Sequence, residues 1–317
     1  MNENIMVSVI CNTYNHEPYI SKCLDGLVMQ KTDFKFEILI HDDASQDRTA
    51  DIIREYEKKY PDIMKPIYQI ENQYSKGGIG QFQYPRAKGK YIAFCEGDDY
   101  WTDPNKLQKQ FEILEKHPEA DMCAHSAVII SEDGNSELGE VCPRQETCVI
   151  PVEEVIAGDG GFVATNSLMY RNGFENNNKN FRKVWSIDYS LQIAGALRGG
   201  MLYLPEKMSV YRYMSRGSWT SVQANDIEKR KHTLNKKIEM LQELNKETKG
   251  VYQDVIDNTI AYAEFWFFYY DGPFRKAMNR KYKKARRKAG KRVNLRLLGK
   301  ILFPWMLLRN RKESTRK

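Results

Sequence analysis

The chain has 317 residues, of which 41% are hydrophobic and 29% charged, the composition of a globular protein with a sizeable buried core. No N-terminal signal peptide is visible, and the apolar run 301–308 contains a proline and is too short to span a membrane, so we expect a cytoplasmic protein. The net charge of the chain is +7. Residues 1–274 carry a net charge of −10 and residues 275–317 a net charge of +17, so the basic excess lies at the end of the chain.

Short apolar runs alternate with helical patterns over the first 130 residues. Strands are predicted at 6–12, 37–41, 65–70, 91–95 and 122–130, and helices at 20–28, 47–60 and 104–116. Such alternation is typical of an α/β fold, in which helices cover both faces of a parallel sheet. Neither a dinucleotide-binding GxGxxG nor a Walker loop follows the first strand.

Polar clusters follow three of these strands at their carboxyl ends. They are Thr13 to His16, Asp42 to Ser45 and Glu96 to Asp99. Each cluster alone could be an ordinary turn or helix cap. Ligands of such sheets bind beyond the carboxyl ends of the strands, so the coincidence of three clusters predicts a ligand site there.

The run 91–101 carries the strongest chemical signal. A buried strand delivers Glu96, Asp98 and Asp99 onto one loop, and Gly97 allows the backbone to turn sharply between them. Crowded carboxylates repel one another unless a cation compensates them. Oxygen ligands of this kind suit Mg²⁺ or Mn²⁺, so we predict a divalent metal site. The alternative, a polar loop that caps the next helix, accounts for Asp103 but not for the three acids upstream.

Two features of the second half could complete such a site. Asp188 begins a helical pattern and could point into the site as a base, although a first-turn acid that complements the helix dipole is the alternative. Arg212 and Arg216 lie in 211–219, where Gly217 offers a hinge. That combination suits a loop that closes on a diphosphate, against the alternative of ordinary surface arginines.

The end of the chain is aromatic and then basic. The run 264–270, EFWFFYY, lies in a helical pattern that begins near Val251, and we expect it to serve packing, with an exposed aromatic face for a lipid-linked ligand as the alternative. Beyond it, leucines and aromatic residues such as Phe303 and Trp305 alternate with Lys and Arg. This pattern favours contact with an anionic membrane surface, against the alternative of a helix packed on the acidic body. We expect no nucleic-acid binding, because no RNA- or DNA-binding module accompanies the charge.

The cysteines and histidines indicate no metal or disulfide site. The six cysteines form no CxxC pair, and four of them lie in apolar strand or helix patterns, where we expect buried free thiols: Cys11, Cys23, Cys95 and Cys123. The five histidines show no metal-ligand spacing.

Three runs carry a resemblance to the family 2 glycosyltransferases of the GT-A fold, and especially to bacterial enzymes of surface-polysaccharide assembly. They are VSVICNTYNHEPYISKCLDGLVMQ, FEILIHDDASQDRTADIIREY and GKYIAFCEGDDYWTDPNKLQKQ. The resemblance covers residues 5–120 well and continues more loosely through TNSLMYRNG and WSIDYSLQIAGALRGGMLYLPEKMSVYRYMSRGSW, to about residue 220. It implies the GT-A fold, a Rossmann-like mixed sheet with helices on both faces, followed here by a C-terminal helical extension.

The resemblance also implies which residues bind the donor nucleotide. Thr13 and Tyr14 would border the base, and Asp43, with Asp42 beside it, would bond the base or the ribose. We assign Asn15 to the same site from its place after the first strand.

The catalytic roles are implied in the same way. Asp98 would hold ribose or metal, Asp99 the metal, and Asp188 would deprotonate the acceptor. Glu96 departs from the family, many members of which have Asp in an Asp-x-Asp triplet. Its longer side chain could still reach the metal.

Together these features predict an inverting, metal-dependent glycosyltransferase with a UDP-sugar as the expected donor. The acceptor would be a glycan or a lipid-linked glycan. We predict a catalytic domain at 1–220, a helical extension at 221–290 and a basic amphipathic tail at 291–317, the last holding the enzyme at the inner face of the cell membrane.

Two alternatives stay open. A nucleotidyltransferase that makes nucleotide sugars shares the sheet and the metal requirement, but its glycine-rich basic loop is not seen after Val9. A non-catalytic nucleotide-sugar-binding or membrane scaffold protein would be favoured if Asp188 were remote from the carboxylates.

Overall fold

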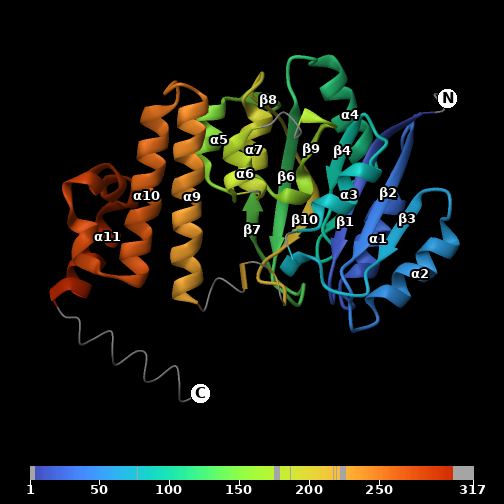
Figure 1. Cartoon of the computed structure of the whole chain (residues 1–317), viewed down its shortest axis with the longest axis horizontal. Helices are drawn as coiled ribbons and strands as arrows, with labels where there is room; N and C mark the ends of the chain where they lie inside the picture. The colour runs from blue at the N-terminus through green and yellow to red at the C-terminus, as the bar shows by residue number, and fades with distance from the viewer. Residues whose placement is uncertain are drawn as a thin grey trace. The chain divides into compact units, whose positions relative to one another are not determined.

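The computed structural model describes residues 4–76, 78–174, 179–185, 187–216, 218, 220–221 and 226–302. The chain divides into two compact units. The first comprises 1–179 and 187–221 and carries the sheet, and the second comprises 180–186 and 222–317 and is helical where it is described (Figure 1). Among the residues described, none of the helices combines the length and hydrophobicity that crossing a membrane requires.

The first unit is built on one mixed sheet. In the part of the chain that the structure describes, ten strands have the order β3-β2-β1-β4-β9-β6-β10-β5, with β7 paired to β6 and β8 to β10. Their bounds are β1 Ile5–Thr13, β2 Lys35–Asp42, β3 Met64–Tyr68, β4 Tyr91–Phe94, β5 Tyr100–Trp101, β6 Met122–Ile130, β7 Glu137–Val141, β8 Cys148–Ile150, β9 Met169–Arg171 and β10 Met201–Arg212. The neighbours β3, β2, β1 and β4 are parallel, whereas β9 is antiparallel to both β4 and β6.

Helices cover this sheet and the second unit is helical. In the first unit the α-helices are α1 Ile20–Val28, α2 Thr49–Lys59, α3 Gly80–Gln83, α4 Lys106–Lys116, α5 Val152–Gly158 and α7 Asp188–Ala196. In the second they are α6 Asn180–Val184, α9 Ile227–Glu247, α10 Gln253–Asp271 and α11 Lys283–Leu302, with short 3₁₀ turns at Phe274–Met278 and Arg280–Tyr282. The predicted mixed α/β architecture with a C-terminal helical part is confirmed.

Two helices begin two residues later than the sequence predicts, and in both cases an aspartate is the reason. The carboxylate of Asp47 accepts the backbone N–H of Thr49 at 2.9 Å, which ends the preceding loop and starts α2 at Thr49. Asp103 likewise accepts the N–H of Asn105 at 2.8 Å, so α4 starts at Lys106. Short polar side chains favour such local bonds to the backbone over helix.

The core of the first unit lies between β1, β2, β4 and the helices α1 and α4. The side chains of α1 that recur at helical spacing are fully buried, among them Ile20, Leu24 and Leu27. Burying each of them contributes about 1.5–3 kcal/mol. All four residues of β4 are buried, as expected for a strand inside a sheet with helices on both faces. The four cysteines that were predicted to be buried are buried and free.

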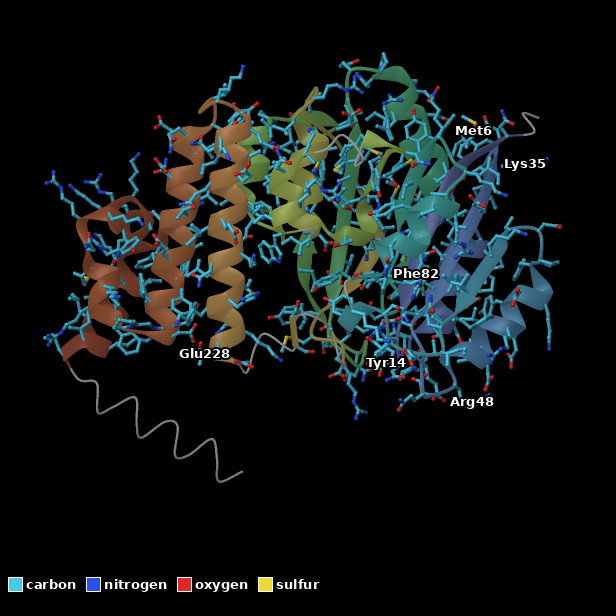
Figure 2. All side chains as sticks on the ribbon, viewed as in Figure 1. Met6, Tyr14, Lys35, Arg48, Phe82 and Glu228 are labelled. Atoms are coloured by element: carbon cyan, nitrogen blue, oxygen red, sulfur yellow. The ribbon has the colours of Figure 1, made fainter. Side chains whose placement is uncertain are left out.

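The parallel strands end together at one edge of the sheet. Thr13 pairs with Asp42 across β1 and β2, and the last residue of β4, Phe94, pairs with Ile10. Figure 2 shows Tyr14 at this edge, whereas Met6 and Lys35 mark the opposite ends of β1 and β2. The three polar clusters predicted from the sequence therefore share one edge.

The second unit has its own core, formed mainly by α10 and α11. Phe265 and Tyr269 of the aromatic run are buried in it, which confirms the packing role predicted for that run. Leu297 of α11 is fully buried there as well, with Val293 packed beside it. The rest of the predicted amphipathic tail, residues 303–317 with Phe303 and Trp305, lies outside the described residues.

Candidate active site

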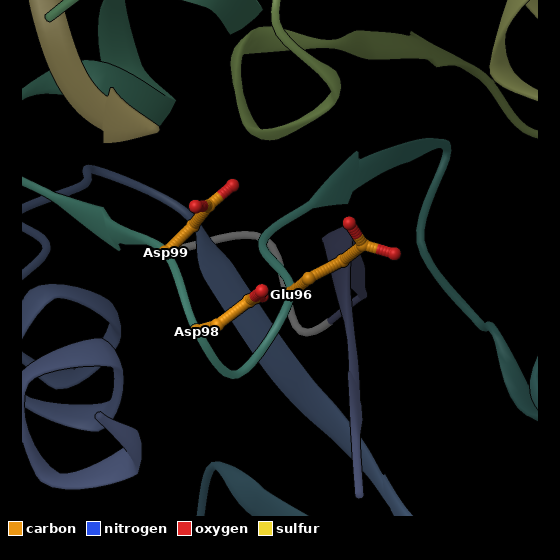
Figure 3. A group of neighbouring side chains, drawn as sticks. All are labelled: Glu96, Asp98 and Asp99. Atoms are coloured by element: carbon orange, nitrogen blue, oxygen red, sulfur yellow. The ribbon is translucent and has the colours of Figure 1, made fainter. Parts of the chain in front are cut away.

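Three carboxylates gather on the loop that follows β4. One carboxylate oxygen from each of Glu96, Asp98 and Asp99 lies within 4.8 Å of the other two, and the three side chains project from one short turn (Figure 3). The loop is fixed to the end of β1 by a backbone bond from Gly97 N–H to the carbonyl of Asn12, 2.9 Å long. The predicted acidic cluster is thus one compact group of oxygen ligands.

Gly97 is required by close packing rather than by a positive φ. A Cβ atom at this position would lie 2.7 Å from both Thr13 Oγ1 and His16 Nδ1. Those two polar atoms are buried and have no hydrogen-bond partner in the described part of the chain. The glycine therefore lets the acidic loop lie directly against the end of β1.

Asp99 is the most firmly held of the three acids. It is 2% exposed, and its Oδ1 accepts the backbone N–H of Arg212 at 2.8 Å while its Oδ2 accepts Nδ2 of Asn166 at 2.9 Å. Burial, with the nearby charge of Asp98, raises the pKa of Asp99 well above its ordinary value. A bound cation would relieve the cost of this buried charge.

Asp98 is tied to the end of β10. Its carboxylate accepts the hydroxyl of Ser215, and its backbone carbonyl accepts Nε of Arg212 at 3.0 Å. The same guanidinium donates to the carbonyl of Glu132 at 2.7 Å and stacks on Tyr19 at 4.5 Å. Arg212 is 6% exposed, so its charge is used to hold the acidic loop.

The other predicted arginine differs from Arg212 in its setting. Arg216 is exposed, in the turn that follows β10. Gly217, the predicted hinge, lies outside the described residues. Of the two guanidiniums, only that of Arg216 is open to a ligand from solvent.

Asp188 lies close enough to Glu96 for their charges to interact. Both residues are exposed to solvent, yet their carboxyl groups are surrounded by protein atoms. This desolvation, together with the charges of Asp188 and Asp98, raises the pKa of Glu96 to about 8. Desolvation also raises the pKa of Asp188, although a hydrogen bond from the hydroxyl of Thr165 opposes the shift.

A polar hollow of about 340 Å³ lies beside the ends of β1 and β2. It is lined by Tyr14, Ala44, Ser45, Gln46, Gln69, Ile70, Glu71 and Asn72. Left-handed backbone at Asn15, with φ of 55°, and at Ala44, with φ of 65°, shapes the two loops above it. Asn15 ties these loops together, since its Oδ1 accepts Gln46 N–H at 2.7 Å and its N–H donates to Ser45 Oγ at 2.9 Å.

The two predicted donor aspartates, Asp42 and Asp43, are buried at the end of β2 and do not line this hollow. Asp43 accepts the backbone N–H groups of Gln73 and Tyr74 at 2.7 and 3.0 Å, so its carboxylate orients the loop that follows β3. Asp42 is buried, which raises its pKa, and its Oδ1 has no partner within the described residues. Of the two aspartates, Asp42 is therefore the one with a carboxylate oxygen that can still accept a hydrogen bond from a ligand.

Sequence reasoning missed several residues at the site. His16 sits among the charges of Asp98, Asp47 and Asp42, while its burial lowers its pKa. Partial burial of its hydroxyl and the nearby charges of Glu96 and Asp188 raise the pKa of Tyr74. Asn166, Ser215 and Thr165 contact the acids from distant parts of the chain. His16 belongs to the first polar cluster, Ser215 to the segment 211–219, and Thr165 and Asn166 to the run TNSLMYRNG, but nothing in the sequence predicts their contacts with the acids.

The acidic cluster fits a divalent cation. It offers three oxygen donors, the kind of ligand that Mg²⁺ and Mn²⁺ prefer. Each oxygen of Asp99 accepts one hydrogen bond and so keeps a second lone pair for a metal. Among the described residues, the only group of three or more His, Cys, Asp or Glu side chains placed to hold a metal ion is formed by these three acids.

Comparison with known proteins places the chain among glycosyltransferases. Residues 8–147 match the family model described as glycosyl transferase family 2. An uncharacterised glycosyltransferase of Nostoc sp. is 30% identical over 233 residues, covering 68% of this chain and 69% of that protein. An uncharacterised protein of Mycobacterium tuberculosis is 39% identical over 221 residues, 68% of this chain, and the chain spans 61% of that relative's length. A poly(ribitol-phosphate) beta-glucosyltransferase of Bacillus spizizenii is 41% identical over 103 residues, 30% of this chain and 15% of that enzyme.

A solved structure shares the fold. S. aureus TarS 1-349 in complex with UDP-GlcNAc matches with a TM-score of 0.62 and 17% identity, over 89% of this chain and 79% of that chain. This likeness confirms the GT-A fold predicted from the sequence. The family match and the Nostoc relative establish that the chain belongs to glycosyltransferase family 2.

Proposed function

We propose that this protein transfers a sugar, with inversion at C1, from a nucleotide-sugar donor to a glycan or lipid-linked glycan acceptor in surface-polysaccharide synthesis. The observation that carries the proposal is the compact cluster of Glu96, Asp98 and Asp99, which lies near enough to Asp188 for the charges of Asp188 and Glu96 to interact, although the two residues are far apart in the sequence. The name of the Bacillus relative, which acts on a poly(ribitol-phosphate), supports a cell-surface polymer as the acceptor class.

The donor would lie across the edge of the sheet. The hollow beside Tyr14 has room for a base and ribose, and its polar lining suits them. Asp42, with its unused acceptor, is the aspartate best suited to bond the nucleoside, and Asp43 would act by holding the loop 73–74. A UDP-linked donor is the one we favour, supported by the UDP-GlcNAc bound to TarS.

Asp98, Asp99 and Glu96 would hold Mg²⁺ or Mn²⁺. When bound, such a cation stabilises the negative charge that builds on a leaving nucleoside diphosphate. Arg212 keeps the loop in shape, because its guanidinium bonds the carbonyl of Asp98. Arg216 is the arginine available to the diphosphate itself.

Asp188 would take the proton from the acceptor hydroxyl. Inversion requires a carboxylate base on the face of the sugar opposite the leaving group. A raised pKa suits this role, because a base works best when its pKa lies near the working pH. The hydroxyl of Thr165 would orient the carboxylate by donating to its Oδ2.

A panel of nucleotide sugars tests the proposal. We expect at least one of them to release its nucleoside diphosphate in the presence of Mg²⁺ or Mn²⁺, with no release when the metal is chelated. Pyrophosphate release from a nucleoside triphosphate and a sugar phosphate would support the nucleotidyltransferase alternative instead. Binding of a nucleotide sugar without turnover, with water or with any glycan acceptor, would support the scaffold alternative.

A further inference from the structure

A pocket of about 310 Å³ opens on the second unit, within one sharply bent helix. Gly290 has φ of 86° and breaks α11 into two segments. The pocket is lined from both segments and from the preceding turn, by Met278, Lys283, Arg286, Arg287, Asn294 and Leu298. In a straight helix Lys283 and Leu298 would be roughly 22 Å apart along the axis, so the bend at Gly290 creates the pocket.

Hydrogen bonds fix the walls of this pocket. Asn294 Nδ2 donates to the carbonyls of Arg286 and Gly290, each at 2.8 Å, which holds the bend. Arg286 Nη1 donates to the carbonyls of Ala277 and Asn279 at 2.7 and 2.8 Å. In the described part of the chain its Nε and Nη2 groups make no further hydrogen bond, so they are available to a ligand. The positive wall is therefore preformed.

Two cations of the pocket are not compensated by acids. Lys281 pairs with Glu264, Lys288 lies over Tyr262, and Lys300 lies over Tyr269 and bonds its carbonyl. Lys283 and Arg287 form no ion pair with any described residue and are exposed, as are Lys284, Lys291, Arg292 and Arg296, but Lys283 and Arg287 line the pocket. No acid occurs in residues 275–302, so the segment cannot neutralise them itself. This concentration of uncompensated charge calls for an anionic ligand.

The rim of the pocket is apolar. Met278 and Leu298 line it and are 41% and 40% exposed. On the same face of α11 as Leu298, Leu295 and Leu302 are 69% and 65% exposed, whereas Val293 and Leu297 on the opposite face pack into the core. A basic pocket beside a stripe of exposed leucines has the two requirements of a lipid site, a seat for a headgroup and a surface for acyl chains.

We propose that this pocket binds the phosphate of an anionic phospholipid. Lys283, Arg286 and Arg287 contact the phosphate, and Leu298 with its neighbours contacts the acyl chains. A free phosphate would contact only the basic side chains, and the exposed Leu295, Leu298 and Leu302 would have no partner in that complex. The inference rests on the described part of α11 and gives a defined site to the contact with an anionic membrane surface that the sequence predicts.

Vesicle binding of the full chain tests this proposal. The pocket variant is Lys283→Gln with Arg287→Gln, and the control is Lys291→Gln with Arg292→Gln, which removes the same charge from exposed positions of the same helix. We expect the pocket variant to bind phosphatidylglycerol-containing vesicles at least about tenfold more weakly than the control, because diffuse attraction depends on charge alone. Equal losses in the two variants would overturn the site and leave only a basic surface.

A second pair of measurements separates a lipid from a free anion. Leu298→Ser should weaken vesicle binding while leaving the binding of glycerol phosphate unchanged. Vesicle binding that is unaffected by Leu298→Ser would assign the pocket to a soluble phosphate and contradict the lipid assignment. Unfolding midpoints of all variants should match the wild type, since every substituted side chain is exposed.

The difference in vesicle binding does not depend on whether the protein transfers a sugar. Hydrolysis of a nucleotide sugar in the absence of lipid should be the same in the pocket variant, the control and the wild type. If no protein turned over any donor, the proposed function would fail, and the difference in vesicle binding between the pocket variant and the control would still decide the lipid site.

Discussion

Asn166 Nδ2 donates to Asp99 Oδ2 at 2.9 Å, and both residues are buried. Asn166 is fixed in turn, because its Oδ1 accepts Ser209 Oγ at 2.7 Å and its Nδ2 also donates to the carbonyl of Val210 at 2.9 Å. The indole of Trp101 donates to its backbone carbonyl at 2.9 Å. The amide thus connects the acidic loop to β10 and sets the orientation of the Asp99 carboxylate.

Replacing the Asn166 amide should weaken metal binding in a protein that is still folded. Asn166→Ala removes buried hydrogen bonds, and we expect the free energy of unfolding to fall by about 1–3 kcal/mol. Loss of a group that orients a metal ligand costs about 10–100-fold in metal affinity. Calorimetric titration with Mn²⁺ should show this loss, whereas the exposed Asn105→Ala should show neither effect. Unchanged Mn²⁺ affinity in Asn166→Ala would mean that Asp99 needs no such support.

Removing either aspartate charge should abolish metal-dependent turnover. We expect Asp98→Asn and Asp99→Asn each to lose at least about a hundredfold in rate, as when a group that acts on transition-state charge is removed. Asp99→Asn should also lower the free energy of unfolding by about 1–3 kcal/mol, because the amide NH2 would face one of the two N–H donors that the carboxylate now accepts, so its rate is compared at a temperature where the variant is folded. Asp62→Asn, an exposed acid outside the site, is the control for the change of charge. Near-normal rates in both site variants would refute the metal assignment.

Asp188→Asn should separate donor binding from transfer. The base acts on the acceptor hydroxyl, so affinity for the donor and for Mn²⁺ should stay close to wild type while transfer to the acceptor stops. Thr165→Val, which removes the hydroxyl that donates to Asp188, should lower the rate less. If calorimetry showed that Asp188→Asn loses donor binding, this carboxylate would be a donor ligand.

Lys106 should make stability depend on pH. Its side chain is fully buried, with Nζ 3.7 Å from the centroid of the Trp101 ring. Burial lowers its pKa from 10.5 to about 7, although the nearby thiols of Cys95 and Cys123 oppose this shift. Between these two values the unfolded chain binds a proton that the folded protein does not, so the contribution of Lys106 to stability rises with pH over that range.

Lys106→Met isolates this effect, since methionine fills a similar volume without a charge. Denaturant unfolding at a series of pH values from neutral to alkaline should show the wild type gaining stability relative to the variant as pH rises. Parallel pH profiles for the two proteins would show that Lys106 is not desolvated in solution.

The sequence predicts what is local in this fold. Periodicity places strands 91–95 and 122–130 within one residue of β4 and β6, and the acidic run directly after β4 is visible without any alignment. The shared edge follows from the rule for parallel strands, since Thr13 and Asp42 pair across β1 and β2.

The features that the sequence does not predict depend mainly on contacts between residues far apart in the chain. The partners of Asp99 lie 67 and 113 residues further along the chain, at Asn166 and Arg212, and no spacing pattern connects them. Arg212 was assigned to the diphosphate because an arginine near a glycine suits such a loop, and its bonds to backbone carbonyls could not be foreseen. The bend of α11 depends on a single positive φ at Gly290, inside a run that otherwise favours one helix.

Mn²⁺ binding followed by electron paramagnetic resonance tests the central claim, that Glu96, Asp98 and Asp99 hold a metal for a nucleoside diphosphate. The signal of free Mn²⁺ should decrease as wild-type protein is added, and more strongly when UDP is present. Asp99→Asn should bind Mn²⁺ at least about tenfold more weakly under both conditions, because losing a ligand costs no less than losing its support. Identical titrations of wild type and Asp99→Asn, with and without UDP, would contradict the claim.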